Sequence, residues 1–131
     1  MDTLSYIWCG LITQLSMSNL CHYDKKNHIG DEGVIALAEV LKVNESVRDV
    51  FLNFNSISSK GAIALAEVLK INDNIVKLDI SDNSIGDEGA VALAEALKVN
   101  STVTAINLAH NSIGKRCRCV GASIEIEFYY Y

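Results

Sequence analysis

A self-similarity with a period of 28 residues constrains this chain more than any other feature of its sequence. Aligning residues 27–54 on 83–110 gives 16 identities in 28 positions, and aligning 55–82 on 83–110 gives 12. The string Ala-Leu-Ala-Glu occurs in each copy, and Leu-Lys follows it shortly afterwards. A fixed period of this length indicates a tandem-repeat architecture, in which each unit is one supersecondary element that stacks on its neighbours.

Each copy carries the pattern of one short strand and one helix. Val50 and Leu52 recur at period two, which points both side chains inward from a strand, and the later copies repeat this spacing. Apolar stripes predict helices over residues 33–42, 61–70 and 89–98. Glycines are expected to open these helices, at Gly33, Gly61 and Gly89. Asparagines are expected to end them in the left-handed conformation, at Asn44, Asn72 and Asn100.

The ends of the predicted helices also suit the helix dipole. Asp31 and Glu32 lie at the positive start of the first helix and Lys42 at its negative end. Ser58, Ser59 and Lys60 replace the acidic start in the middle copy, where a serine can still cap the helix.

A unit of this size cannot bury its own apolar face, so the copies must stack. Neighbouring strands are then parallel and about 4.8 Å apart. Helices are wider than this spacing, so the stack curves. The fold class is therefore α/β, with parallel strands on the concave side of a curved stack and helices on its convex side.

The unit Leu-x-x-Leu-x-Leu-x-x-Asn-x-Ile, followed by a glycine and Leu-Ala-x-x-Leu, resembles the leucine-rich repeat. Its 28-residue length with an α-helix resembles the ribonuclease-inhibitor-like class, which also occurs in NOD-like receptors and Ran GTPase-activating proteins. The resemblance implies a right-handed solenoid. It also implies a ladder in which the recurrent asparagine bonds the backbone of neighbouring turns, at Asn55, Asn83 and Asn111. The fold alone says almost nothing about which partner such a protein binds.

Both ends depart from the repeat. Residues 1–26 are predicted to form an irregular N-terminal cap, with an amphipathic helix over 3–17 and a first strand that is missing or irregular. Residues 27–114 are the tandem repeats. Residues 115–131 form an atypical tail whose last eight residues alternate in the manner of a strand. The tail could cover the exposed edge of the sheet, or it could be a disordered remnant.

Composition excludes several classes of function. The formal net charge of −5 argues against nucleic-acid binding. Only a short basic stretch favours such binding, at Lys115, Arg116 and Arg118. No membrane segment is expected, because the uncharged stretch 3–23 contains too many polar side chains. The four cysteines lack the paired spacing of a zinc site, so we expect reduced thiols, a cytoplasmic location and neither metal nor cofactor.

The predicted function is non-enzymatic recognition of another protein on the concave strand face. The variable positions there are the candidate binding residues: Asp49, Phe51, Asn53, Lys77, Asp79, Ser81, Asn107 and His110. Phe51, Asp79 and Asn107 are expected to form one row across adjacent strands. An aromatic group dominates many interfaces, although Phe51 could instead be covered by the N-terminal segment. Asp79 and Asp82 favour a partner with basic groups.

Two alternatives follow from the resemblance alone. The chain could be a regulator, an activator, of a small GTPase, for which Arg48, placed before a strand, could be proposed. It could also be a fragment of a larger NOD-like-receptor-type sensor. An enzyme in its own right is not expected, because the three histidines have no recognisable nucleophile and no glycine loop cradles phosphate.

Overall fold

A computed structural model describes residues 14–16, 29–114 and 125–127. Strands and helices alternate through the repeats. In chain order the elements are β1 (Gln14–Ser16), α1 (Gly30–Leu41), β2 (Asp49–Phe51), α2 (Ser59–Ile71), β3 (Lys77–Asp79), α3 (Gly86–Val99), β4 (Ala105–Asn107) and β5 (Glu125–Glu127).

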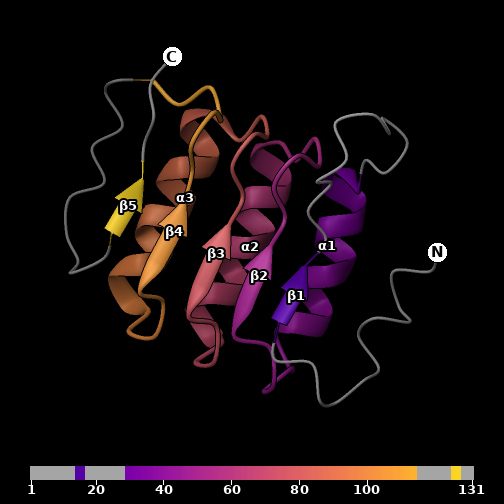
Figure 1. Cartoon of the computed structure of the whole chain (residues 1–131), viewed down its shortest axis with the longest axis vertical. Coiled ribbons are helices and arrows are strands. Elements are labelled where there is room, and N and C mark those ends of the chain that lie inside the picture. Colours follow the sequence, from indigo (N-terminus) through magenta and orange to yellow (C-terminus); the bar gives the residue numbers. More distant parts are fainter. Residues whose placement is uncertain (1–13, 17–28, 115–124, 128–131) are drawn as a thin grey trace.

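The strands form one parallel sheet in the order β1-β2-β3-β4-β5, and the three helices lie together on one side of it (Figure 1). Each helix is the crossover between two neighbouring parallel strands, as a stacked βα unit requires. The predicted α/β leucine-rich-repeat solenoid is therefore confirmed. Among the helices that the structure describes, none is long and apolar enough to cross a membrane.

The core lies between the sheet and the helices. Val50, Leu78 and Ile106 occupy the same position in β2, β3 and β4, and their side chains are 3% exposed or less. Leucines of the helices meet them from the other side, at Leu37, Leu65 and Leu93. The alternation read from the sequence thus puts the predicted side chains into the core.

The glycine prediction was wrong in position. Each helix begins two or three residues before Gly33, Gly61 or Gly89, so these glycines lie within the helices. Close packing explains them better. A Cβ on Gly89 would lie 2.9 Å from the Cβ of Ala62 and 3.3 Å from the Cα of Ser59, both on the neighbouring helix α2. The helices can approach this closely because a hydrogen atom stands where other residues carry a side chain.

The asparagine prediction was wrong in backbone conformation. Asn72 and Asn100 follow their helices with φ of −91° and −81°, in extended backbone. The left-handed residues other than glycine follow the strands, at Phe54, Ser56, Asp82, His110 and Ser112. The chain therefore makes its left-handed turn on leaving the sheet.

The two outermost strands break the repeat period. Gln14 pairs with Asp49, 35 residues later, whereas Asp49 pairs with Lys77 at the repeat distance of 28. The helix predicted over 3–17 is wrong for residues 14–16, which form β1, and its other residues lie outside the described part of the chain. At the other edge, Glu125 pairs with Ala105 after only 20 residues. The strand-like alternation of the tail is therefore correct over 125–127, where β5 covers the edge of β4.

Candidate functional site

The first asparagine ladder ties the turns that follow the strands. The Asn83 Oδ1 accepts hydrogen bonds from the backbone N–H groups of Asn55 and Ile57, both at 3.0 Å. The Asn83 Nδ2 donates to the carbonyls of Leu52, Ile80 and Ser81. One side chain thus satisfies backbone groups of its own repeat and of the preceding one. Inside a low-dielectric core such bonds are structural, because each unpaired group would cost free energy.

The next rung, at Asn111, shares this geometry. The Asn111 Nδ2 donates to the carbonyls of Ile80, Leu108 and Ala109, and its Oδ1 accepts from the N–H of Ile85 at 3.4 Å. Asn55 is completely buried and donates to the carbonyl of Asn53. All three ladder asparagines therefore face the interior and lie away from any binding face.

A second asparagine ladder, which was not predicted, ties the turns that follow the helices. The Asn72 Oδ1 accepts from the N–H groups of Asn74 and Ile75, and its Nδ2 donates to the carbonyls of Leu41 and Asn44. Asn100 repeats this arrangement one repeat later. Its Oδ1 accepts from the N–H groups of Thr102 and Val103, and its Nδ2 donates to the carbonyls of Leu69 and Asn72. The 28-residue spacing of these asparagines could have predicted this ladder. It was instead interpreted as a preference for left-handed backbone at the helix ends, whereas it reflects hydrogen bonding by the side chains.

An acidic contact links the starts of the first two helices. The Asp31 carboxylate accepts from the N–H groups of Ser58 and Gly61, at 2.8 and 3.1 Å, and from the Ser58 hydroxyl. It therefore caps α2 from the neighbouring repeat. Burial acts to raise the pKa of Asp31, but these hydrogen bonds and the charge of Lys60 lower that pKa overall. Asp87 occupies the same place two repeats on and accepts from the N–H of Gly114.

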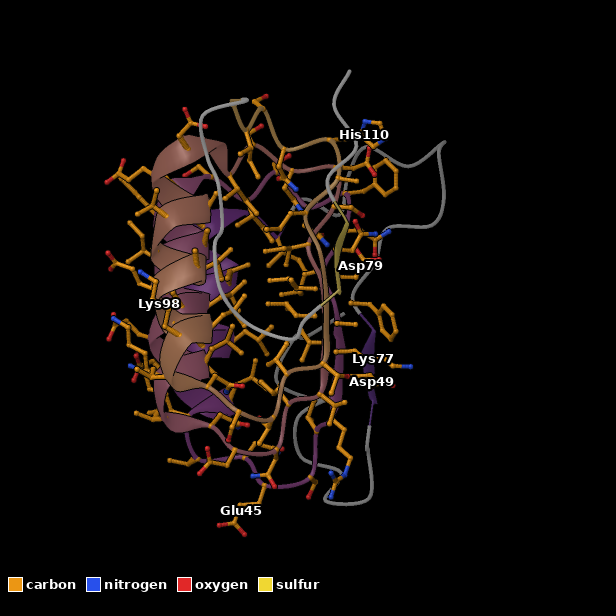
Figure 2. The ribbon with its side chains drawn as sticks, turned by 90° about the vertical axis from the view of Figure 1, so that its left-hand side faces the viewer. Glu45, Asp49, Lys77, Asp79, Lys98 and His110 are labelled. Atoms are coloured by element: carbon orange, nitrogen blue, oxygen red, sulfur yellow. The ribbon has the colours of Figure 1, made fainter. Side chains whose placement is uncertain are left out.

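The outward side of β2, β3 and β4 is the strand face: Asp49, Phe51, Lys77, Asp79, Ala105 and Asn107. The register places Phe51 beside Asp79 and Asp79 beside Asn107, which makes the expected row. The three side chains of this row are each half-buried. Figure 2 shows Asp49, Lys77, Asp79 and His110 on this side of the molecule, opposite Lys98 on the helix side.

Hydrogen bonds hold the acid of the row in place. The Asp79 Oδ1 accepts from the N–H and the hydroxyl of Ser81, at 3.0 and 2.7 Å, and the Asn107 Nδ2 donates to the Asp79 Oδ2 at 3.4 Å. Ser81 is only 6% exposed, so its predicted place among the binding residues is corrected. Its buried hydroxyl orients the Asp79 carboxylate.

The remaining candidates lie at the ends of the strands. Asn53 is half-buried, and its carbonyl accepts the hydrogen bond of the ladder residue Asn55. His110 is exposed and left-handed, in line with Phe54 and Asp82 at the same position of the two preceding repeats. An aromatic ring, a carboxylate and an imidazole thus follow β2, β3 and β4. In the described part of the chain, no group of three His, Cys, Asp or Glu side chains could hold a metal ion.

The comparisons with known proteins agree with this architecture. The sequence pattern of the family described as Leucine Rich repeat matches residues 25–38, 43–66, 72–94 and 99–116. These segments make up more than half of the chain, so the chain belongs to the leucine-rich-repeat family. No curated protein sequence matches it. Among solved structures, Leiomodin-1 Actin-Binding Site 2 is similar with a TM-score of 0.69 and 22% identity, over 90% of this chain and 70% of that one. That likeness shows the shared fold.

Proposed function

We propose that this chain is a non-enzymatic module that recognises another protein on its strand face, in the cytoplasm. The observation that carries the proposal is the row Phe51, Asp79 and Asn107, in which an aromatic ring, a carboxylate and an amide stand side by side on neighbouring strands. Rigid strands hold these side chains in a fixed pattern, which lowers the entropy lost on binding. The positions vary from repeat to repeat while the surrounding backbone does not, as a recognition surface requires.

The chemistry of the face favours a basic partner with an apolar anchor. Phe51, and Phe54 in the turn after β2, supply aromatic surface. Among the described residues of the strand face and of the turns that follow its strands, the carboxylates Asp49, Asp79 and Asp82 outnumber the cation Lys77. Complementary charge speeds association and selects the partner, while a desolvated aromatic group contributes more of the affinity. The name of the similar structure, an actin-binding site, supports a protein as the partner and makes actin the first candidate to test.

The GTPase alternative would depend on Arg48. This residue is exposed in the loop before β2, and its carbonyl accepts backbone hydrogen bonds from Val76 and Lys77 at 2.7 and 3.1 Å. Its backbone therefore continues the pairing of neighbouring repeats. Any residue type can make these bonds, and the Val76 carbonyl makes them one repeat later with Thr104 and Ala105. They neither require an arginine nor support a catalytic one, so recognition remains our proposal.

Binding of purified actin, and affinity capture from native extract with each captured protein then purified, will test the strand face. We expect Phe51→Ala and Asp79→Lys each to weaken binding of the verified partner at least about tenfold, as interface residues of this kind do. The matched control is Glu95→Lys, which makes the same charge change on the exposed side of α3. It should leave binding within about twofold.

Circular dichroism of each variant will show that it is folded before binding is compared. If both strand-face variants are folded and bind the verified partner as tightly as the parent chain, the strand face is not the recognition surface. Loss of binding with Glu95→Lys alone would place the site on the helix side.

A further inference from the structure

The turns that follow the strands carry a second row of side chains. Phe54, Asp82 and His110 occupy one repeat position and are all left-handed, with φ of 59°, 53° and 55°. Together they form the turn row. The Phe54 N–H donates to the carbonyl of Ser81 at 3.2 Å, and the Asp82 N–H donates to that of Ala109 at 2.9 Å. The pairing of the repeats therefore continues into these turns, where the neighbouring backbones lie about 4.8 Å apart.

The turn row has the same chemical order as the row on the strands. Phe51 and Phe54 come from β2 and the turn that follows it, and Asp79 and Asp82 hold the same two positions one repeat later. The register therefore sets a carboxylate beside each ring. A column of two aromatic side chains runs along a column of two acids, so a ring and an acid can act together on one group of a partner.

The strands do not balance the charge of these two acids. At the starts of the strands, Asp49 lies beside Lys77, so opposite charges meet in the register. Asp79 and Asp82 instead have an aromatic ring on one side and an amide or an imidazole on the other. Within the described repeats, no lysine or arginine stands beside either acid in its row. The uncompensated negative charge therefore lies next to the rings and favours a cation there.

Phe54 and Asp82 are more open to a partner than Phe51 and Asp79. Phe54 is 37% exposed, whereas Phe51 is half-buried. The Asp79 Oδ1 already accepts from the N–H and the hydroxyl of Ser81. The Asp82 carboxylate accepts no hydrogen bond from any residue that the structure describes. Both of its oxygens can therefore accept from one incoming group.

We propose that Phe54 and Asp82 receive an arginine side chain of the partner, an inference that rests on the proposed function. The guanidinium plane lies on the Phe54 ring, and two of its N–H groups donate to the two oxygens of Asp82. A guanidinium makes both contacts at once, because its flat face stacks on aromatic rings and its fork of donors matches a carboxylate.

These two contacts distinguish arginine from lysine. An ammonium group is a compact, strongly hydrated charge, and it has neither a flat face nor a fork. Charge alone would attract both residue types to Asp79 and Asp82. A preference for arginine over a lysine of equal charge is therefore the property that is specific to this site.

Nuclear magnetic resonance titration of the full chain with two capped tripeptides will test the site. The probes are acetyl-Gly-Arg-Gly-amide and acetyl-Gly-Lys-Gly-amide, which carry the same charge, each added up to about 50 mM to cover very weak binding. We expect the arginine probe to shift the ring signals of Phe54 and the carboxyl signal of Asp82, with a dissociation constant of about 10 mM. The lysine probe should bind at least about fivefold more weakly.

Three variants make the test specific. Asp82→Asn removes the charge and one of the two acceptors, and should weaken the arginine probe at least about fivefold. Phe54→Leu removes the ring but keeps an apolar side chain, and should weaken it about threefold. Asp73→Asn is the matched control, because it neutralises an exposed carboxylate in the loop before β3, at the opposite ends of the strands. It should change the dissociation constant by less than about twofold.

The backbone amide signals will show that each variant is folded. Equal binding of the two probes by the parent chain would overturn the inference. So would the lack of a saturable shift at Phe54, or unchanged binding by both Asp82→Asn and Phe54→Leu. Failure of the proposed function would appear separately, because a verified partner would then tolerate Phe51→Ala and Asp79→Lys. A partner that needs those two residues, in a chain that does not prefer the arginine probe, would keep the recognition surface and remove the arginine from it.

Discussion

The inside of the solenoid and its strand face are built on the same repeat, yet they treat their residues in opposite ways. The two asparagine ladders keep one residue type in every copy, because each amide bonds backbone groups whose positions recur. The strand face presents Asp49, Lys77 and Ala105 at one repeat position and Phe51, Asp79 and Asn107 at another. Within this chain, constancy therefore marks what the fold needs, and variation marks what the surface is free to use.

The comparison predicts its largest effect at Asn83. Asn83→Ala removes five hydrogen bonds and leaves buried N–H and C=O groups in two repeats without that partner. We expect a loss of about 4 kcal/mol in the free energy of unfolding, measured by urea denaturation. Asn107→Ala on the strand face is the control and should cost less than about 1 kcal/mol. Equal losses would contradict the distinction between interior and face.

The second ladder predicts a slightly smaller effect at Asn72. Asn72→Ala removes four hydrogen bonds, two of which reach back to the preceding repeat, and should cost about 3 kcal/mol. Asn44 stands at the same position in the first repeat and is only half-buried. Its Oδ1 accepts from Ser46 and Val47, so we expect about 1 kcal/mol for Asn44→Ala. Chemical denaturation of the two variants in parallel will show whether the bond to the neighbouring repeat makes the difference.

Gly89 tests the spacing between helices. Gly89→Ala gains helix propensity but forces a methyl group against Ala62 and the backbone of Ser59 in α2, so we expect a net loss of about 2 kcal/mol. A Cβ on Gly89 or Gly33 would also lie too close to the Cγ2 of the isoleucine four residues earlier, Ile85 or Ile29. Gly33→Ala lacks the contact with a neighbouring helix, so it should cost about 1 kcal/mol less than Gly89→Ala. Thermal melting will rank the two. If both variants are equally stable, close packing does not explain these glycines.

These positions also show how far the sequence determined the result. Identical residues 28 apart predicted the repeat and the strand register, because a contact made once recurs at the same spacing. The first ladder was implied by the resemblance to the leucine-rich repeat. The physical reason why each recurring residue is needed was harder to predict from the sequence. Asn72 and Gly61 were interpreted by their backbone preferences, whereas a side-chain bond and a neighbouring helix account for them. Those causes depend on how close the repeats approach, which no single unit reveals.

The outermost strands of the sheet could not be predicted from the repeat, for a related reason. β1 pairs with β2 at a sequence separation of 35 residues, and β5 pairs with β4 at a separation of 20. Neither follows the 28-residue period, so the repeat does not predict these two strands. The candidate site was accessible in part. Register placed Phe51, Asp79 and Asn107 in one row, but the burial of Ser81 and its hydrogen bond to Asp79 could not be predicted from the sequence.

Asp31 should give a smaller effect that depends on pH. Its pKa in the folded chain is below the usual value, so its ionised form stabilises the fold above about pH 4. That stabilisation is lost as the pH falls through the lower pKa of the folded state. Asp31→Ala should cost about 1 kcal/mol at pH 7, the usual value for a lost helix cap, and less at pH 3. Urea denaturation at both pH values will check this, and an equal loss at both would show that charge is not involved.

The smallest effect on stability is expected at Lys77. This side chain is exposed on the strand face, and its repeat position holds an acid in β2 and alanine in β4. Lys77→Ala therefore introduces a residue that the same backbone already carries one repeat later, and the free energy of unfolding should change by less than about 0.5 kcal/mol. Urea denaturation beside Asn83→Ala measures the full range between face and ladder. A loss above 1 kcal/mol at Lys77 would mean that the variable positions also support the fold, and variation could then no longer be taken as the mark of the recognition surface.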